Sequence, residues 1–145
     1  MKKILFISAI FLLITSCSET TKEAKEEIEE TKVEKMDAPE VQLNEGQLWE
    51  ANMATIEGIK NLSVMAESFD SSSENYETLQ SNLRDEFGLI FKNCTMKGEA
   101  HEQLHNYLLP LMELFGELTE EASEKTLGKI KEHLARFDSY FVMDA

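Results

Sequence analysis

The chain has 145 residues, of which 28 are acidic and 14 are basic, and its formal net charge is −14. Phosphate backbones and anionic lipid headgroups repel such a chain. The charge therefore argues against a nucleic-acid partner and against electrostatic binding to a membrane. Beyond residue 44, about 100 residues remain, which is enough for one small domain with one hydrophobic core.

The first 16 residues have the pattern of a secretory signal peptide. Lys2 and Lys3 precede an apolar run over residues 4–14, which is too short for a transmembrane helix of about 20 apolar residues. The run ends in Thr15, Ser16 and Cys17. Residues 13–17 resemble the lipobox of bacterial lipoproteins, in which an aliphatic residue and two small residues precede a cysteine.

The lipobox resemblance implies cleavage before Cys17, acylation of Cys17 and attachment to a membrane through the lipid. Two or three acyl chains hold a protein firmly at a bilayer, whereas one chain binds only marginally. Ser18 resembles the residue that sorts lipoproteins to the outer rather than the inner membrane. The acidic stretch from Glu19 leaves both the periplasmic and the cell-surface face open. The alternative is an ordinary signal peptide in which Cys17 is incidental.

A polar tether follows over residues 17–44. Residues 18–45 contain ten acidic and four basic side chains and no aromatic residue. Such a stretch buries too little apolar surface to offset its ordering entropy, so we expect a disordered tether, with a frayed helix as the local alternative. The chain thus divides into a signal peptide (1–16), a lipidated tether (17–44) and a folded domain (45–145).

The folded domain is predicted to be all-α, because apolar residues recur at helical spacing and no strand is evident. The four expected apolar faces run from Trp49 to Phe69, from Tyr76 to Cys94, from Leu104 to Leu118 and from Leu127 to Phe141. Short connections favour an up-down-up-down four-helix bundle.

The predicted helix boundaries rest on local signals. Asn44 with Gln47, and Ser71 with Glu74, have the spacing of a capping box at the starts of the first two helices. Pro110 should kink the third helix, because it removes a backbone hydrogen bond. Three helix-interior glycines each cost about 1 kcal/mol relative to alanine, so we expect close helix contacts at Gly58, Gly88 and Gly128.

Ligands for soft metals gather where the second helix ends and the third begins. Cys94, Met96, His101 and His105 lie within twelve residues, and the two histidines, four residues apart, share one helix face. In an up-down-up-down bundle the start of the first helix reaches the same pole, so Met53, beside Trp49, should lie nearby.

A metal site is the sharpest interpretation of this cluster. Since lipid occupies Cys17, Cys94 is the only free thiol of an exported protein, which implies burial, an intermolecular partner or a ligand role. Thiolate and thioether select copper(I), while imidazole suits copper and zinc. We therefore expect copper capture or buffering by Cys94, His101 and His105, completed by Met96 or Met53, with zinc as the alternative metal. The sequence indicates no particular protein partner.

Residues 101–105 also match the H-E-x-x-H pattern of zinc peptidases, with Glu102 as the general base. Such a site needs a third ligand, for which Glu120, Glu121 and Glu124 are candidates, and a strand that binds the substrate. No strand is evident, so the domain is expected not to be an enzyme.

Three further interpretations stay open. The cluster residues could simply pack, in a structural or partner-binding lipoprotein. A haem could be held by Met53 and His105. His133 is expected to be a half-buried structural residue.

A weaker resemblance covers residues 45–143. A ridge of residues spaced i, i+3 over 49–58 suits a helix–helix contact. Together with the turn over 94–96, this ridge resembles small uncharacterised helical lipoproteins of the Bacteroidetes type. That resemblance implies handling of heavy metals.

Overall fold

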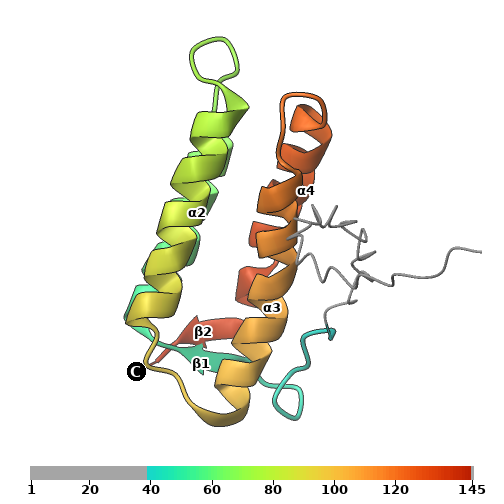
Figure 1. Cartoon of the computed structure of the whole chain (residues 1–145). Helices are drawn as coiled ribbons and strands as arrows, with labels where there is room; N and C mark the ends of the chain where they lie inside the picture. The colour runs from blue at the N-terminus through green and yellow to red at the C-terminus, as the bar shows by residue number, and fades with distance from the viewer. Residues whose placement is uncertain (1–38, 145) are drawn as a thin grey trace, which may run out of the picture. The chain divides into compact units, whose positions relative to one another are not determined.

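The computed structural model describes residues 39–144, which form a mostly helical domain of four helices with a small two-stranded sheet (Figure 1). In chain order the elements are β1 (Trp49–Ala51), α1 (Met53–Ser68), α2 (Tyr76–Asn93), α3 (Gly98–Glu117), α4 (Ser123–Leu134), a 3₁₀ turn η1 (Phe137–Ser139) and β2 (Phe141–Met143). The predicted signal peptide, the predicted lipidation site Cys17 and most of the predicted tether lie outside the described residues.

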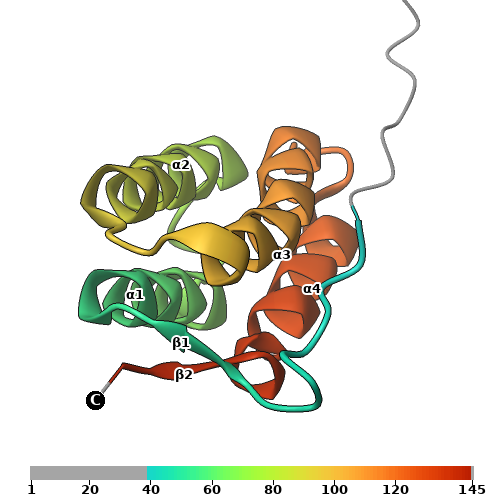
Figure 2. The same cartoon turned by 90° about the horizontal axis from the view of Figure 1, so that it is seen from below.

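Hydrophobic burial explains the arrangement of the helices. Helix α1 packs against α2 and α4, and α3 packs against α4 and α2, so that each apolar stripe faces a central core (Figure 2). The residues without measurable exposure include Leu62 of α1, Leu83 of α2, Leu111 of α3 and Ile130 of α4. One contiguous core therefore includes a leucine or isoleucine from every helix, as the apolar spacing predicted.

The sheet joins the two ends of the domain and corrects the all-α prediction. Strands β1 and β2 are parallel, with Trp49 opposite Phe141 and Ala51 opposite Met143. The backbone N–H of Trp49 donates to the carbonyl of Tyr140 at 2.8 Å, and the N–H of Asp144 donates to the carbonyl of Ala51 at 3.0 Å. Trp49 was therefore wrongly assigned to the first helix. A three-residue strand is too short to show a clear alternation in the sequence.

The first helix begins eight residues later than the predicted capping box. Asn44 and Gln47 instead exchange two backbone hydrogen bonds across a tight turn. Its two central residues, Glu45 and Gly46, have positive φ angles of 51° and 86°, as the hairpin-type turn requires. The true N-cap residue is Asn52, whose side-chain oxygen accepts from the hydroxyl of Thr55 at 2.8 Å.

The second helix begins at Tyr76 rather than in the serine cluster. The side chain of Asn75 accepts a hydrogen bond from the backbone N–H of Thr78 at 2.8 Å and thereby caps the helix. In the preceding turn, Asp70 accepts from both the backbone and the hydroxyl of Ser72, and these bonds lower the pKa of the Asp70 carboxyl group. Asn75 therefore provides the cap that we predicted for Ser71 and Glu74.

Only one of the three helix glycines marks a close helix contact. A Cβ atom at Gly58 of α1 would overlap the side chain of Ile90 in α2, so glycine is required there for these helices to pack. A Cβ atom at Gly88 or Gly128 would meet no atom within 4 Å. The close contact expected at those two glycines was therefore wrong.

The third helix continues through Pro110, which lies in its interior as predicted. Residues 39–144 contain no helix that is both long enough and apolar enough to cross a bilayer.

Candidate functional site

The predicted cluster centres on a contact between Cys94 and His101. Cys94 directly follows the last residue of α2, and His101 lies in the first turn of α3. The connecting loop enters α3 at Gly98, whose φ of +62° favours glycine. This path brings the Cys94 Sγ atom to 3.6 Å from the His101 Nδ1 atom, and both residues are half-buried.

The second histidine stacks beside the first. The ring centroids of His101 and His105 are 4.4 Å apart with an interplanar angle of 57°. On its other side, His105 meets the edge of Phe91 from α2, with centroids 5.5 Å apart. Partial burial lowers the pKa of His105, and the neighbouring His101 lowers it further. A neutral imidazole, which can act as a metal ligand, is thereby favoured at His105.

The two candidate methionines differ in their surroundings. Met96, in the loop between α2 and α3, is partly buried against the hydrophobic core, as is Cys94. Met53 is the first residue of α1 and is 49% exposed. The start of α1 does reach the predicted pole, because the Asn52 side chain donates to the carbonyl of Asn93 at the end of α2. The exposed side chain of Met53 makes it a weaker candidate than Met96.

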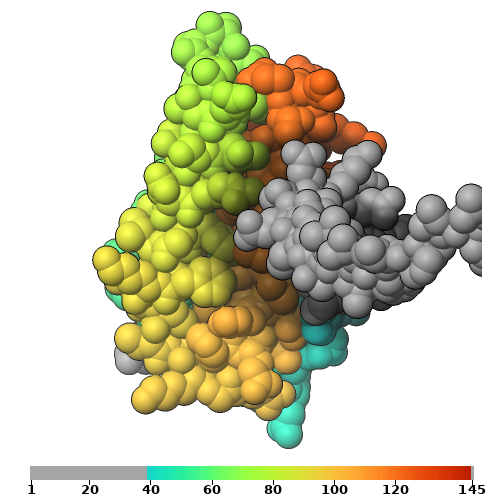
Figure 3. All heavy atoms as spheres, in the orientation of Figure 1, coloured from blue at the N-terminus to red at the C-terminus, as the bar shows by residue number. Residues whose placement is uncertain are grey.

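The surface around the pair is more open than predicted. Both Phe91, which packs against His105, and Met112, two turns further along α3, belong to the expected apolar faces, yet they are 43% and 48% exposed. Helical spacing predicts which face points inward, but it does not predict how wide the covered stripe is. In the space-filling view, the end of α2 (yellow) and the start of α3 (light orange) meet at the lower surface (Figure 3).

Within residues 39–144, no three His, Cys, Asp or Glu side chains converge as a metal site would require. Cys94 and His101 are in contact, and the His105 ring stacks beside that of His101. Structural zinc takes four protein ligands in a tetrahedron. Among residues 39–144, these side chains therefore do not supply the protein ligands of such a zinc site.

The candidate third ligands of the peptidase interpretation lie at the wrong end of α3. Helix α3 runs from Gly98 to Glu117, so residues beyond 119 are about 25 Å from His101 by helix rise. Glu120 also accepts a hydrogen bond from the backbone N–H of Tyr76, at the opposite pole. Our expectation that Glu120, Glu121 or Glu124 could join the histidines was wrong.

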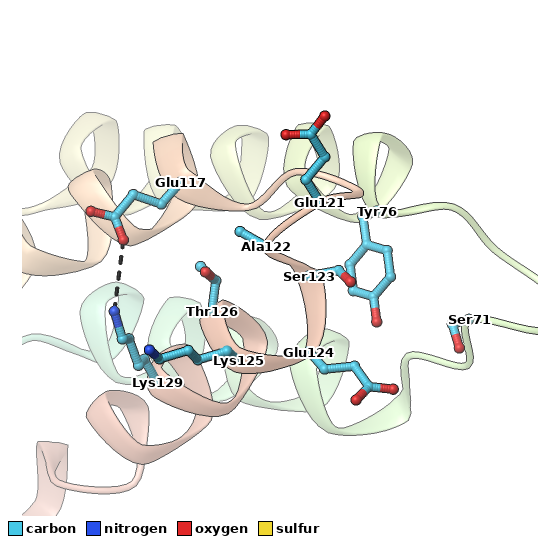
Figure 4. A pocket seen from close by; sticks show the side chains of 10 residues that line it. All are labelled: Ser71, Tyr76, Glu117, Glu121, Ala122, Ser123, Glu124, Lys125, Thr126 and Lys129. Atoms are coloured by element: carbon cyan, nitrogen blue, oxygen red, sulfur yellow. Dashed lines mark ion pairs between the residues drawn. The ribbon is translucent and has the colours of Figure 1, made fainter.

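That far pole carries an open, strongly charged pocket of about 850 Å³ (Figure 4). Its walls come from the end of α3, the start of α4 and the turn before α2. They include Glu117, Glu121 and Glu124 together with Lys125 and Lys129. Only Glu117 and Lys129 form an ion pair, at 3.9 Å, and both side chains are about half exposed. Exposed pairs of this kind contribute little to stability, and the pocket walls are solvated charges.

No protein-family model matches the chain. No curated protein or solved structure is detectably similar to it either.

A second polar arrangement joins Tyr107 to His133, of which only His133 was singled out from the sequence. His133 of α4 is half-buried, as predicted, and its Nε2 atom donates to the backbone carbonyl of Tyr107 at 2.9 Å. The hydroxyl of Tyr107 in turn donates to the carbonyl of His133 at 2.8 Å. Burial raises the pKa of Tyr107 well above its usual range. Tyr107 could have been found from its helical spacing, since it precedes Leu111 by one turn.

Proposed function

We propose that this chain is a lipid-anchored protein of the bacterial cell envelope whose helical domain captures or buffers copper(I) at Cys94 and His101. Apart from its short sheet, the domain would be an up-down-up-down four-helix bundle. Cys17 would carry the lipid, and the outer membrane is favoured over the inner one. The observation that supports the metal site most directly is the 3.6 Å contact between the Cys94 Sγ atom and the His101 Nδ1 atom.

Ligand chemistry favours copper(I) over the alternatives. A thiolate and an imidazole form a soft to borderline pair, which copper(I) accepts at a low coordination number. The half-buried setting of Cys94 gives an ion access and limits the solvent that reaches it. Met96 from the same loop, or His105, could then move in as a third ligand.

Copper binding can be tested by titrating the purified protein anaerobically with copper(I) against a coloured chelator. A Cys17→Ser background leaves Cys94 as the only thiol. We expect about one equivalent of tightly bound copper. Cys94→Ala should weaken binding most, His101→Ala strongly, and His105→Ala less.

His133→Gln serves as the matched control, because His133 bonds the Tyr107 carbonyl and is not a candidate ligand. Equal copper affinity in the parent and in Cys94→Ala would overturn the proposal. Loss of binding in the His133 control alone would point to unfolding, which circular dichroism of each variant would reveal.

The anchor needs a separate test. When the chain is expressed in a bacterium with labelled palmitate, we expect the label in the protein and the protein in the membrane fraction. Cys17→Ala should abolish both. Label that persists in Cys17→Ala would disprove lipidation at this residue without touching the copper result.

A further inference from the structure

A second cavity, of about 210 Å³, lies between the first described residues and the middle of α3. It is separate from the copper site, because Tyr107 lies two residues from His105 and thus on nearly the opposite face of α3. Its walls come from the irregular segment over residues 39–42, which we call the entering segment, and from α3, the end of α4 and the residue before β2. The lining residues include Glu40, Asn106, Tyr107, Pro110, Arg136 and Tyr140.

Hydrogen bonds hold two parts of this cavity in place: the Tyr107–His133 pair and the entering segment. The side chains of Tyr107 and His133 each donate a hydrogen bond to the other's backbone carbonyl, at 2.8 and 2.9 Å, and so hold α3 and α4 together at the cavity. The entering segment is fixed by the backbone N–H of Gln42, which donates to the side chain of Gln103 at 2.7 Å. The indole N–H of Trp49 donates to the carbonyl of Gln42 at 2.6 Å. The backbone around the cavity is therefore largely preformed, while the exposed side chains of Glu40 and Arg136 can adjust to a ligand.

Opposite charges line this cavity without meeting each other. Glu40 comes from the entering segment, and Arg136 follows α4. Among residues 39–144, neither side chain has an opposite charge within 4.0 Å, because the ion pairs there are Lys129 with Glu117 and Lys131 with Glu67. The guanidinium of Arg136 is instead oriented by the Nδ1 atom of His133, at 3.5 Å. The space between Arg136 and Glu40 thus matches a ligand with one charge of each sign.

We propose that this cavity binds a zwitterion of amino-acid size. The guanidinium of Arg136 would take the ligand carboxylate, for which its planar fork is well suited. The Glu40 carboxylate would take the ammonium group. The rings of Tyr107 and Pro110 would contact the apolar part of the ligand. A simple carboxylate fits less well, because it would leave Glu40 beside a like charge.

The proposal is tested with the full-length protein and ligand-observed NMR, using the free amino acids one at a time at millimolar concentration. Three derivatives of the best binder report on its charges: the N-acetyl form lacks the ammonium, the amide lacks the carboxylate, and the N-acetyl amide lacks both. We expect the free amino acid to bind at least about tenfold more tightly than the first two, and the third not to bind.

Variants identify the protein groups. Arg136→Gln should remove the preference for the free amino acid over the amide, and Glu40→Gln the preference over the N-acetyl form. Arg84→Gln is the matched control, because Arg84 lies on α2 beside Gly116 and does not line the cavity. Circular dichroism confirms folding, and Arg136→Lys retains the charge if Arg136→Gln unfolds. The proposal is overturned if no amino acid binds at 10 mM, on the order of the weakest measurable affinity. Binding unchanged in both Arg136→Gln and Glu40→Gln would overturn it as well.

Discussion

Tyr107 and His133 form a reciprocal clasp between α3 and α4, in which each side chain donates a hydrogen bond to the other's backbone carbonyl. The clasp lies three residues before Pro110, in the turn of α3 where the proline removes a backbone donor. The carbonyl that loses its helix donor there is that of Asn106, four residues before the proline, so the clasp ties α3 to α4 directly beside the break.

Removing one half of the clasp should destabilise the domain. Tyr107→Phe keeps the ring but removes its hydrogen bond to the carbonyl of His133, which then retains the backbone N–H of Arg136 at 3.1 Å, so we expect a loss of about 1 kcal/mol. Urea denaturation followed by circular dichroism measures the loss. Tyr140→Phe is the matched control, because the Tyr140 side chain is half exposed, and its unfolding free energy should change by less than about 0.5 kcal/mol. Equal losses in the two variants would argue against the clasp.

Stability should fall as the pH drops from 8 to 5. The pKa of His133 is lowered from its ordinary value of 6.5, mainly by burial and further by Arg136, against the opposing effect of its hydrogen bond to Tyr107. Below 6.5 the unfolded state therefore binds a proton that the folded state resists, so the contribution of His133 is complete above this pH and is lost below it.

Urea midpoints at several pH values would measure this dependence. His133→Gln keeps an N–H donor for the Tyr107 carbonyl but cannot titrate, so it should flatten the profile. The pKa of His105 is also lowered, and His105→Gln should remove a smaller part of the slope because that ring is less buried. An unchanged profile in the double variant would show that carboxylates alone govern the pH dependence.

The helix glycines should respond to alanine in opposite directions. Gly58→Ala forces a methyl group into Ile90 and should cost about 1–3 kcal/mol through overpacking. Gly88→Ala and Gly128→Ala meet no neighbour and should stabilise the domain by up to about 1 kcal/mol each, because alanine is the better helix former. Thermal unfolding of the three variants would check the signs, and a stabilising Gly58→Ala would disprove the close contact between α1 and α2.

The entering segment (residues 39–42) should become more mobile when its hydrogen bond to Gln103 of α3 is removed. Gln103→Met preserves the length of the side chain but removes the oxygen that accepts from the Gln42 N–H, at a cost of about 1 kcal/mol. Hydrogen exchange of the Gln42 amide should accelerate while amides in the middle of α2 keep their protection. Exchange that accelerates everywhere would instead indicate global destabilisation.

The sequence predicted the helices better than it predicted their ends. Leucines such as Leu62, Leu83 and Leu111 are fully buried as their spacing required, since one residue in three or four must face the core. Trp49 and Phe141 are buried too, but on paired strands rather than on helices. Nothing local in three residues distinguishes a strand whose partner lies almost a whole domain away.

The candidate site was predictable in part, for a physical reason. The contact between Cys94 and His101 follows from a short loop between two antiparallel helices, which chain connectivity alone suggests. The stacking of His105 on His101 follows from their spacing of four residues. The cavity between Glu40 and Arg136 was not predictable, because it depends on how the entering segment lies against α3 and α4.

The pairing of β1 with β2 has a consequence for the order in which the domain can assemble. Trp49 lies before α1 and Phe141 after α4, so their ladder joins residues 92 positions apart in the sequence. Closing so long a loop is entropically costly and slow compared with local helix formation. The helices can therefore associate while synthesis is still under way, whereas the strands cannot pair until Phe141–Met143 has been made. A chain cut off before Phe141 would keep most of its helix-forming residues and leave the backbone of β1 exposed to any other extended segment.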